Sequence, residues 1–338
     1  MPTFCRHNRL IQNCPICSRE QHVEMRPMVS PSGPRTGQPS SPRSRARGGS
    51  SSRTAARSGS GRFTARAGSG VTVRKLDRGP EDGYRSALVP GLKSGADAER
   101  LAEELAFAST RLATLASQPP GLYAEVADPA GELEERAWLA FLIAYLGPLD
   151  GEDPFAAIER ARTTWSSGRP PALEGVRTGP RAAHQPANDG RTVEAYRAWA
   201  ARAGSQSAAF TGEPSWPSQR RFARAFERLS LPGFPRDARF ELLTTLGRLG
   251  VYELQAGALQ LGGSDTVTTG AKRALGIGDP LLLERRAAEL AGACELPLEA
   301  LDVGLYNWER GSRATLGLGL DSEPDPGVLE ATRGALGL

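Results

Sequence analysis

The sequence predicts an all-α protein in which a helical domain follows a small metal-binding segment and a basic linker. Apolar residues recur at helical spacing in several segments between residues 96 and 308. None of these segments alternates apolar and polar residues with the period of two that is typical of strands. We therefore expect four parts: a zinc knuckle at 1–22, a disordered linker at 23–82, a helical domain at 83–312 and a loose C-terminal tail at 313–338.

Charge is distributed unevenly along the chain. The 338 residues carry a formal net charge of only +4, from 42 Lys and Arg against 38 Asp and Glu. From residue 25 to residue 76 there is no acidic residue, so the remainder of the chain is net acidic. This asymmetry favours a polyanion-binding arm. The basic residues of that stretch are Arg26, Arg35, Arg43, Arg45, Arg47, Arg53, Arg57, Arg62, Arg66, Arg74 and Lys75.

Four potential metal ligands lie close together at the amino end. Cys5, His7, Cys14 and Cys17 form a CxH…CxxC pattern. Zinc binds Cys and His in tetrahedral sites, and a CxxC pair is its usual half-site. All four ligands would come from the protein, so we predict a structural zinc that supplies the folding free energy of the segment. A redox CxxC pair or unconnected thiols are the alternatives.

Residues 30–70 consist almost entirely of Ser, Gly, Arg, Pro, Thr and Ala. Such a segment buries too little apolar surface to offset its chain entropy, so we expect it to be disordered. Its arginines favour contact with nucleic-acid phosphates without sequence preference.

The sequence also bears on cellular location. No segment approaches the ~20 consecutive apolar residues that a membrane helix needs. Residues 1–9 lack the apolar core of a signal peptide. Three of the four cysteines lie within the first 17 residues, unlike a secreted disulfide framework. We expect an intracellular, cytoplasmic protein with no membrane partner.

The first helices of the domain are predicted from apolar spacing. Residues 96–116 carry one apolar face. Residues 132–146 include Trp138–Leu146, which is apolar around its whole circumference and indicates a central, buried helix. Shorter helices are expected at 154–165, with Asp153 as a possible cap, and at 192–203. The Pro/Gly-rich segment 168–190 is predicted to be a surface loop, and we assign no role to its His184.

The stretch from residue 218 to residue 308 is the most informative part of the sequence. Ser218 is expected to cap a helix that ends near Leu229 and carries basic residues at four-residue spacing: Arg220, Arg224 and Arg228. Such a stripe is more often a solvated face than a ligand site. The turn Leu231-Pro232-Gly233-Phe234 follows, and a second helix then begins near Arg236 and Arg239.

Asp265 opens the next predicted helix, which ends at Gly276. A carboxylate at this position is favoured by the unpaired N–H groups of the helix end. Two further amphipathic helices continue to Trp308, and the apolar stripe that carries Cys294 indicates that this thiol belongs to the core.

Two segments of this stretch resemble the helix-hairpin-helix DNA glycosylases. They are Leu231–Phe234 and the run from Ser264 to Gly276 that contains Lys272 and Arg273. The resemblance implies a glycosylase-like fold, a DNA phosphate held near Gly233 and a catalytic Asp265 at the lesion pocket. Pro235 stands in place of the family's second glycine and removes one N–H donor.

Taken with Trp138–Leu146 and Phe222–Leu249, the run from Lys272 to Asp279 is similar to the alpha-glutamyl/putrescinyl thymine pyrophosphorylases. That resemblance covers about residues 84–310. It implies an enzyme that acts on a pyrophosphorylated hydroxymethyl-uracil in DNA, where an amine displaces pyrophosphate. The base would have to leave the stack, and cations would be needed near the leaving group. The candidates for those cations are Arg236, Arg239, Lys272 and Arg273.

Three classes of function remain open at this stage. The first, which we favour, is an enzyme that modifies or releases a base in DNA. The second is a noncatalytic adaptor that binds DNA, or RNA, through the zinc knuckle, the basic arm and the helical domain. The third is a protein-interaction scaffold, expected if the arginine stripe pairs with local acids.

Overall fold

The computed structural model describes residues 79–188, 190–319 and 322–338. The chain divides into two units, residues 1–70 and 71–338, and all that follows concerns the second. The predicted zinc ligands Cys5, His7, Cys14 and Cys17 lie outside the described residues, as does nearly all of the predicted linker. The zinc site therefore stays a prediction.

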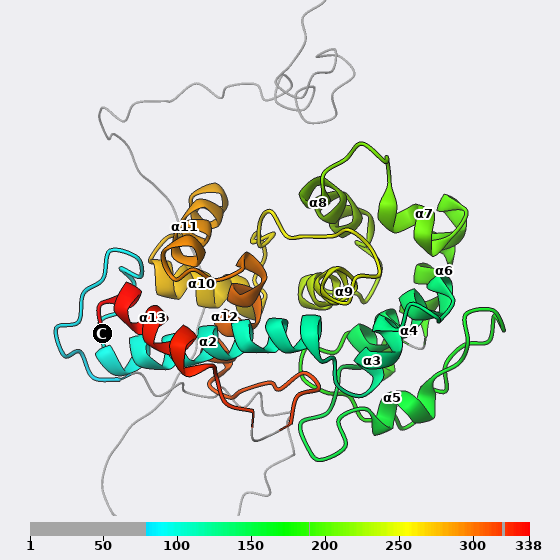
Figure 1. Ribbon diagram of the computed structural model, residues 1–338, viewed down its shortest axis with the longest axis horizontal. Coiled ribbons are helices and arrows are strands. Elements are labelled where there is room, and N and C mark those ends of the chain that lie inside the picture. Colours follow the sequence, from blue (N-terminus) through cyan, green and yellow to red (C-terminus); the bar gives the residue numbers. More distant parts are fainter. Residues whose placement is uncertain (1–78, 189, 320–321) are drawn as a thin grey trace, which may run out of the picture. The chain divides into compact units, whose positions relative to one another are not determined.

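The predicted all-α class is confirmed, because the described residues contain helices and turns but no strand (Figure 1). The α-helices are α2 (Gly95–Ser117), α3 (Leu122–Ala127), α4 (Leu133–Leu146), α5 (Ala156–Ala161), α6 (Arg191–Ala203), α7 (Gln206–Thr211), α8 (Ser218–Arg228), α9 (Arg236–Arg248), α10 (Thr266–Leu275), α11 (Pro280–Ala293), α12 (Leu298–Arg310) and α13 (Pro326–Leu336).

The long helix α2 connects two groups of helices. It packs against α12 and α13, and α12 in turn contacts α10 and α11. At its other end α2 contacts α9, which packs on α4. In Figure 1 the segment between α9 and α10 crosses from one group to the other above α2. Asp265, the N-cap of α10, lies at the end of this crossing segment.

Helix α4 is the central helix of the second group, as its apolar circumference predicts. All of its residues from Ala140 to Leu146 are buried. The ring of Phe141 stacks on that of Tyr196 from α6, with centroids 3.8 Å apart, and also on Trp138 and Tyr145 of its own helix. Stacked aromatic pairs of this kind stabilise a core beyond their buried area. They fix α6 against α4.

Some helix ends differ from the predictions. Helix α5 is shorter than expected and ends at Ala161, because the Glu135 carboxylate accepts hydrogen bonds from the backbone N–H groups of Trp165 and Ser166 and holds that segment outside a helix. Asp153 does not cap it, since the N-cap position is Phe155. Ser218 is the first residue of α8 rather than its cap, which is Pro217.

The segment after residue 313, expected to be a loose tail, packs onto the domain. Leu316 and Leu336 are each 1% exposed. The Tyr84 hydroxyl donates a 2.6 Å hydrogen bond to the carbonyl of Leu336, and the Arg333 guanidinium pairs with Glu99 of α2. Apolar residues spaced along α13 give it a face that α2 covers, so the last helix is part of the same core.

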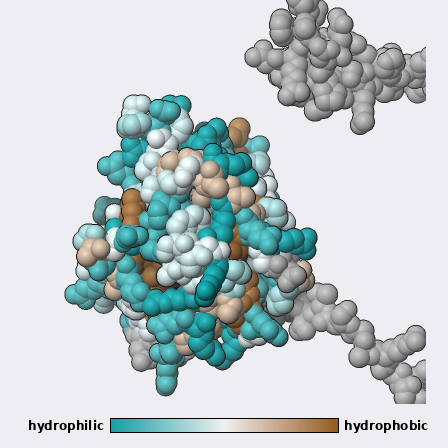
Figure 2. Space-filling model, turned by 90° about the vertical axis from the view of Figure 1, so that its right-hand side faces the viewer, coloured by the Kyte–Doolittle hydropathy of each residue, from teal (hydrophilic) through white to brown (hydrophobic). Residues whose placement is uncertain are grey.

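The surface offers few apolar side chains. Among the described residues, the exposed large apolar ones are Leu133, Leu281, Leu282 and Leu338. The face shown in Figure 2 is mostly hydrophilic, with apolar residues visible only in small separate areas. None of the helices in the described ranges combines the length and the apolar character that a membrane span requires.

The turn between α8 and α9 depends on Gly233. Its φ is 72°, a left-handed conformation that costs other residues about 1–2 kcal/mol. We expect Gly233→Ala to lower the free energy of unfolding by about 1 kcal/mol, measured by urea denaturation. Gly292→Ala on the exposed side of α11 is the control, since alanine stabilises a helix there. A Gly233→Ala protein as stable as the native chain would contradict the prediction.

Candidate functional site

The predicted hairpin is present as a tight turn between α8 and α9. The N–H of Phe234 donates to the carbonyl of Leu231 at 3.1 Å, with Pro232 and the left-handed Gly233 between them. Proline followed by a left-handed glycine is typical of a type II turn. Pro235 is the N-cap of α9, so the helix begins directly after the turn. Pro232 and Gly233 are exposed, so their backbone lies at the surface near the amino end of α9. Helix amino ends stabilise anions.

Asp265 caps α10, as the sequence predicts. Its Oδ1 accepts a 2.9 Å hydrogen bond from the N–H of Thr268, and its Oδ2 accepts a 2.7 Å bond from the Thr268 hydroxyl. Both bonds are to its own helix. The side chain is only partly buried, so the carboxylate keeps an accessible side. Capping is confirmed, and a catalytic role for Asp265 stays a prediction.

The segment that leads from α9 to Asp265 is held in place by charged side chains. The Glu284 carboxylate on α11 accepts hydrogen bonds from the N–H groups of Leu259 and Leu261, at 2.7 and 2.5 Å. The Glu299 carboxylate on α12 accepts one from the N–H of Ala256 at 3.1 Å. Carboxylates that accept several backbone N–H groups are strong, charge-assisted anchors. They replace the regular hydrogen bonds that this irregular segment lacks.

A buried ion-pair network lies beneath the amino end of α9. The Asp302 carboxylate on α12 is 1% exposed and binds both the Arg181 and the Arg236 guanidinium groups. Arg236 also donates to the carbonyl of Leu259. Arg181 donates to the backbone carbonyl of Asp237 at 3.2 Å. One carboxylate thus ties together α9, α12, the segment before α6 and the α9–α10 connection.

Arg181 itself has an unusual backbone. Its φ is 64°, in the left-handed region that non-glycine residues rarely adopt. Its guanidinium lies over the ring of Tyr306, 4.9 Å from the centroid, in addition to its pair with Asp302. Residues in such conformations persist where the surrounding structure holds them, and they concentrate at functional sites.

Asp237 lies within electrostatic range of Asp265. Burial raises the pKa of Asp237, the negative charges of Asp302 and, to a smaller extent, Asp265 add to that rise, and Arg181 and Arg236 oppose it. The Asp237 side chain is 14% exposed, and its Oδ1 accepts from Arg236 at 3.1 Å. Pairs of acids in unlike environments are typical of acid–base sites.

Arg239 belongs to the same neighbourhood. Burial and the charge of Arg236 lower the pKa of its guanidinium, and the charge of Asp265 opposes that effect. The group donates to the carbonyl of Phe226 at 3.1 Å and lies over the ring of that residue. Arg239 therefore lies within electrostatic range of both Arg236 and Asp265.

The remaining predicted basic residues are placed in different ways. On α8, Arg220, Arg224 and Arg228 are exposed; Arg220 stacks on Trp216, and Arg224 pairs with Glu227 of the same helix at 3.1 Å. On α10, the Lys272 ammonium donates to the carbonyl of Gly263 at 3.2 Å. Arg273 pairs with Glu309 and stacks on Trp308. Arg236, predicted to contact phosphate, is 8% exposed and bound to Asp302.

Sequence reasoning missed Asp302, Arg181, Glu284 and Glu299. One signal was available for Asp302 and Glu299. Both lie among the apolar residues of α12, and acids are almost never fully buried unless they are paired. The local sequence contains no comparable signal for Arg181 or Glu284.

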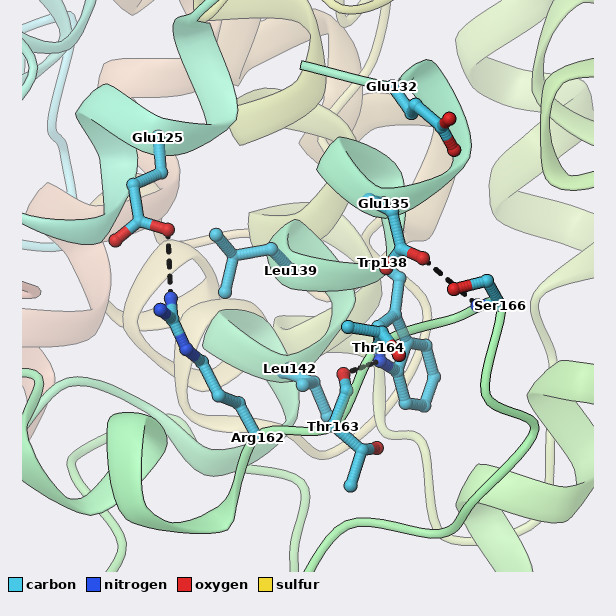
Figure 3. A pocket seen from close by; sticks show the side chains of 10 residues that line it. All are labelled: Glu125, Glu132, Glu135, Trp138, Leu139, Leu142, Arg162, Thr163, Thr164 and Ser166. Atoms are coloured by element: carbon cyan, nitrogen blue, oxygen red, sulfur yellow. Dashed lines mark hydrogen bonds and ion pairs between the residues drawn. The ribbon is translucent and has the colours of Figure 1, made fainter.

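Two pockets on the described residues have linings that do not include Asp265. One of about 640 Å³ is bounded by α3, α4 and residues 162–166 (Figure 3). Leu139 and Leu142 form its centre, and its edges carry the Glu125–Arg162 pair, Glu132 and Glu135. It contains none of the predicted site residues. Among the described residues no group of three or more His, Cys, Asp or Glu side chains is arranged to hold a metal ion.

His184 lines a second pocket and is buried against Tyr145. Burial lowers the pKa of its imidazole. A lowered pKa means that the unfolded chain binds the proton more readily, so stability rises with pH through the region just below 6.5. We expect the unfolding free energy to fall between pH 7 and pH 5.5, and to fall less in His184→Gln, measured by urea denaturation at each pH. Equal pH dependence in both proteins would contradict this.

Residues 180–311 match the family model described as alpha-glutamyl/putrescinyl thymine pyrophosphorylase clade 3. The match covers less than half of the chain and leaves out Trp138–Leu146. It includes Asp265, the α8–α9 turn and the Arg181–Asp302–Arg236 network. No curated protein and no solved structure shows significant similarity to the chain. The predicted resemblance is therefore confirmed over residues 180–311 alone.

Proposed function

We propose that the helical unit binds DNA and acts on a modified thymine or uracil base, either by pyrophosphate displacement or by base release. The observation that carries this proposal is the match of residues 180–311 to the thymine pyrophosphorylase model. That segment contains Asp237 and Asp265, which lie at the amino ends of α9 and α10. The helix-hairpin-helix character of the α8–α9 turn is part of the same proposal.

In this proposal the two acids have different roles. Asp265 is held at the start of α10 by Thr268 and stays available to stabilise positive charge or to activate a nucleophile. Asp237, whose pKa burial raises, carries a proton to or from the reacting group. Lys272, bound to the carbonyl of Gly263 two residues before Asp265, is a candidate cation for the leaving pyrophosphate. Arg273 is a second candidate for that role.

DNA contact is assigned to the exposed part of the α8–α9 hairpin. Arg220, Arg224 and Arg228 project from α8, and the backbone at Gly233 reaches the phosphate. In this assignment Arg236 does not contact DNA but stabilises the hairpin, because its guanidinium is buried and bonded to Asp302 and to the carbonyl of Leu259. Arg239 is half-buried and donates to the carbonyl of Phe226 on α8.

Binding of the full-length protein to duplex DNA over a range of salt concentrations tests this assignment. Each phosphate contact contributes about 0.9 to the slope of log K against log salt. We expect Arg224→Gln with Arg228→Gln to reduce the slope by about 2 and to weaken binding to all sequences alike. Arg285→Gln with Arg286→Gln on α11 removes the same charge elsewhere and serves as the control. An unchanged slope in the α8 variant would remove this helix from the interface.

A noncatalytic adaptor is the second candidate function. The observation in its favour is that both hydrogen bonds of Asp265 go to Thr268 of its own helix. This protein would bind DNA through the same arginines and would leave the bases unchanged. Incubation with DNA that contains pyrophosphorylated hydroxymethyl-uracil and with uracil-containing DNA, followed by analysis of the released and modified bases, separates the two candidates.

A further inference from the structure

Gln260, in the connection between α9 and α10, has an unusual backbone. Its φ is 60°, in the left-handed region that residues other than glycine rarely adopt. This conformation is strained in a residue with a side chain, because the Cβ atom lies too close to the following carbonyl oxygen. Glycine avoids the strain, and the same connection has glycine at Gly257, Gly262 and Gly263. Position 260 therefore keeps a side chain where glycine would be the more stable choice.

The contacts on both sides of Gln260 hold its backbone in place. The N–H groups of Leu259 and Leu261 both donate to the Glu284 carboxylate of α11. The carbonyl of Leu259 accepts from the Arg236 guanidinium. None of these bonds involves the Gln260 side chain. They account for the conformation of the connection, but not for a glutamine at this position.

The Gln260 carboxamide has no hydrogen-bond partner among the described residues, and the residue is partly exposed. Arg181 has a similar backbone conformation, but its guanidinium is bound to the buried Asp302. A carboxamide both donates and accepts hydrogen bonds. Strained residues concentrate at functional sites. A strained glutamine whose amide has no partner in its own chain is therefore a candidate for contact with a ligand.

The connection that carries Gln260 is joined to both helix ends of the proposed site. The Leu259 carbonyl is bound by Arg236, which directly precedes Asp237 in the first turn of α9. The same connection ends at Asp265, the N-cap of α10 (Figure 1). The contacts that position Gln260 therefore also join the helix ends that carry the two acids.

We propose that the Gln260 carboxamide binds the polar edge of the substrate base. This inference rests on the proposed function, in which a thymine or uracil derivative leaves the stack and enters the site. The imide edge of such a base has an N–H donor between two carbonyl acceptors. The carboxamide oxygen accepts from that N–H, and the carboxamide NH₂ group donates to a neighbouring carbonyl. Glycine at position 260 would relieve the strain and lose both bonds.

Substitutions at position 260 separate this contact from the role of the backbone. Gln260→Met keeps the length of the side chain and removes both hydrogen bonds, so base modification or release should slow about tenfold. Gln260→Gly should slow the reaction to the same extent and raise the urea concentration at the midpoint of unfolding, because it relieves the strain. The substrates are DNAs that contain uracil or pyrophosphorylated hydroxymethyl-uracil, with putrescine as the amine.

Glu295→Gly is the matched control. Glu295 follows α11, is exposed and has a φ of 54°. Its replacement by glycine should raise the urea midpoint in the same way and leave the activity unchanged. Gln260→Gly decides the matter if Gln260→Met folds poorly, since the glycine variant is expected to be the more stable of the two.

A change in the substrate tests the same contact from the side of the DNA. Methylation of the base at N3 removes the N–H of the imide edge. The base is placed opposite an abasic position, so that methylation does not alter its pairing. N3-methylation should slow the native chain about tenfold and have little further effect on Gln260→Met, because the two changes remove one shared interaction.

Two results would overturn the inference and leave the proposed function intact. One is a Gln260→Met or Gln260→Gly protein that reacts at the native rate. The other is equal slowing of the native chain and of Gln260→Met by N3-methylation. A native chain that neither modifies nor releases a base in any of these substrates contradicts both the inference and the proposed function.

Discussion

Asp302→Ala is expected to lower the free energy of unfolding by about 3–5 kcal/mol, the range for breaking a buried ion pair by removal of one partner. The carboxylate is bound by two guanidinium groups, Arg181 and Arg236, which are both more than nine-tenths buried. Burial alone would lower the pKa of Arg236, yet the charges of Asp302 and Asp237 outweigh it and raise that pKa. Without Asp302 both cations lose their main partner. Urea denaturation gives the measurement.

Glu227→Ala is the matched control, since it removes the carboxylate of the exposed pair with Arg224. Exposed pairs contribute about 0.2–1 kcal/mol, so this variant should be nearly as stable as the native chain. If Asp302→Ala costs no more than Glu227→Ala, the buried network does not hold the amino end of α9. Asp302→Asn would then also be expected to have little effect.

The helices could be predicted well because their information is local. The apolar circumference of residues 138–146 predicts a buried helix, and α4 is one. Asp265 at the start of a predicted helix predicts an N-cap, and its hydrogen bond from the N–H of Thr268 confirms it. The core position of Cys294 is confirmed as well, and burial raises the pKa of its thiol to about 11.

The charged interior could not be predicted, because its partners are far apart in the sequence. Asp302 lies 66 residues from Arg236 and 121 from Arg181. No spacing rule connects them; only the packing of α12 against the amino end of α9 does. The sequence offers Arg236 as a candidate phosphate contact, and for the same reason it gives no sign that this guanidinium is bound to the buried Asp302.

The shortest helices could not be predicted, for a related reason. Helices α3 and α7, of six residues each, are too short to show a period. The sequence predicts a loose tail after residue 313, but α13 packs on α2. The pair of Arg333 with Glu99 joins residues 234 positions apart, so local spacing does not reveal this packing.

Asp265→Asn is expected to reduce base modification or release at least about 100-fold, in line with the loss of a charged or proton-transferring catalytic group. Asparagine caps a helix about as well as aspartate, so the unfolding free energy should change little. The substitution therefore separates the catalytic role of the carboxylate from its bond to the N–H of Thr268. Product analysis with hydroxymethyl-uracil and uracil substrates gives the rate, and urea denaturation gives the stability.

Asp279→Asn provides the same change at another helix start, because Asp279 caps α11 through the N–H of Leu282 at 2.9 Å. It should leave both activity and stability unchanged. If both variants keep full activity, Asp265 is a cap and no more, and Asp237 becomes the remaining acid at the site. If both variants lose activity to the same extent, the loss comes from the altered helix caps and not from a carboxylate that acts on the DNA base. Only a loss confined to Asp265→Asn places the charge of that residue in the reaction.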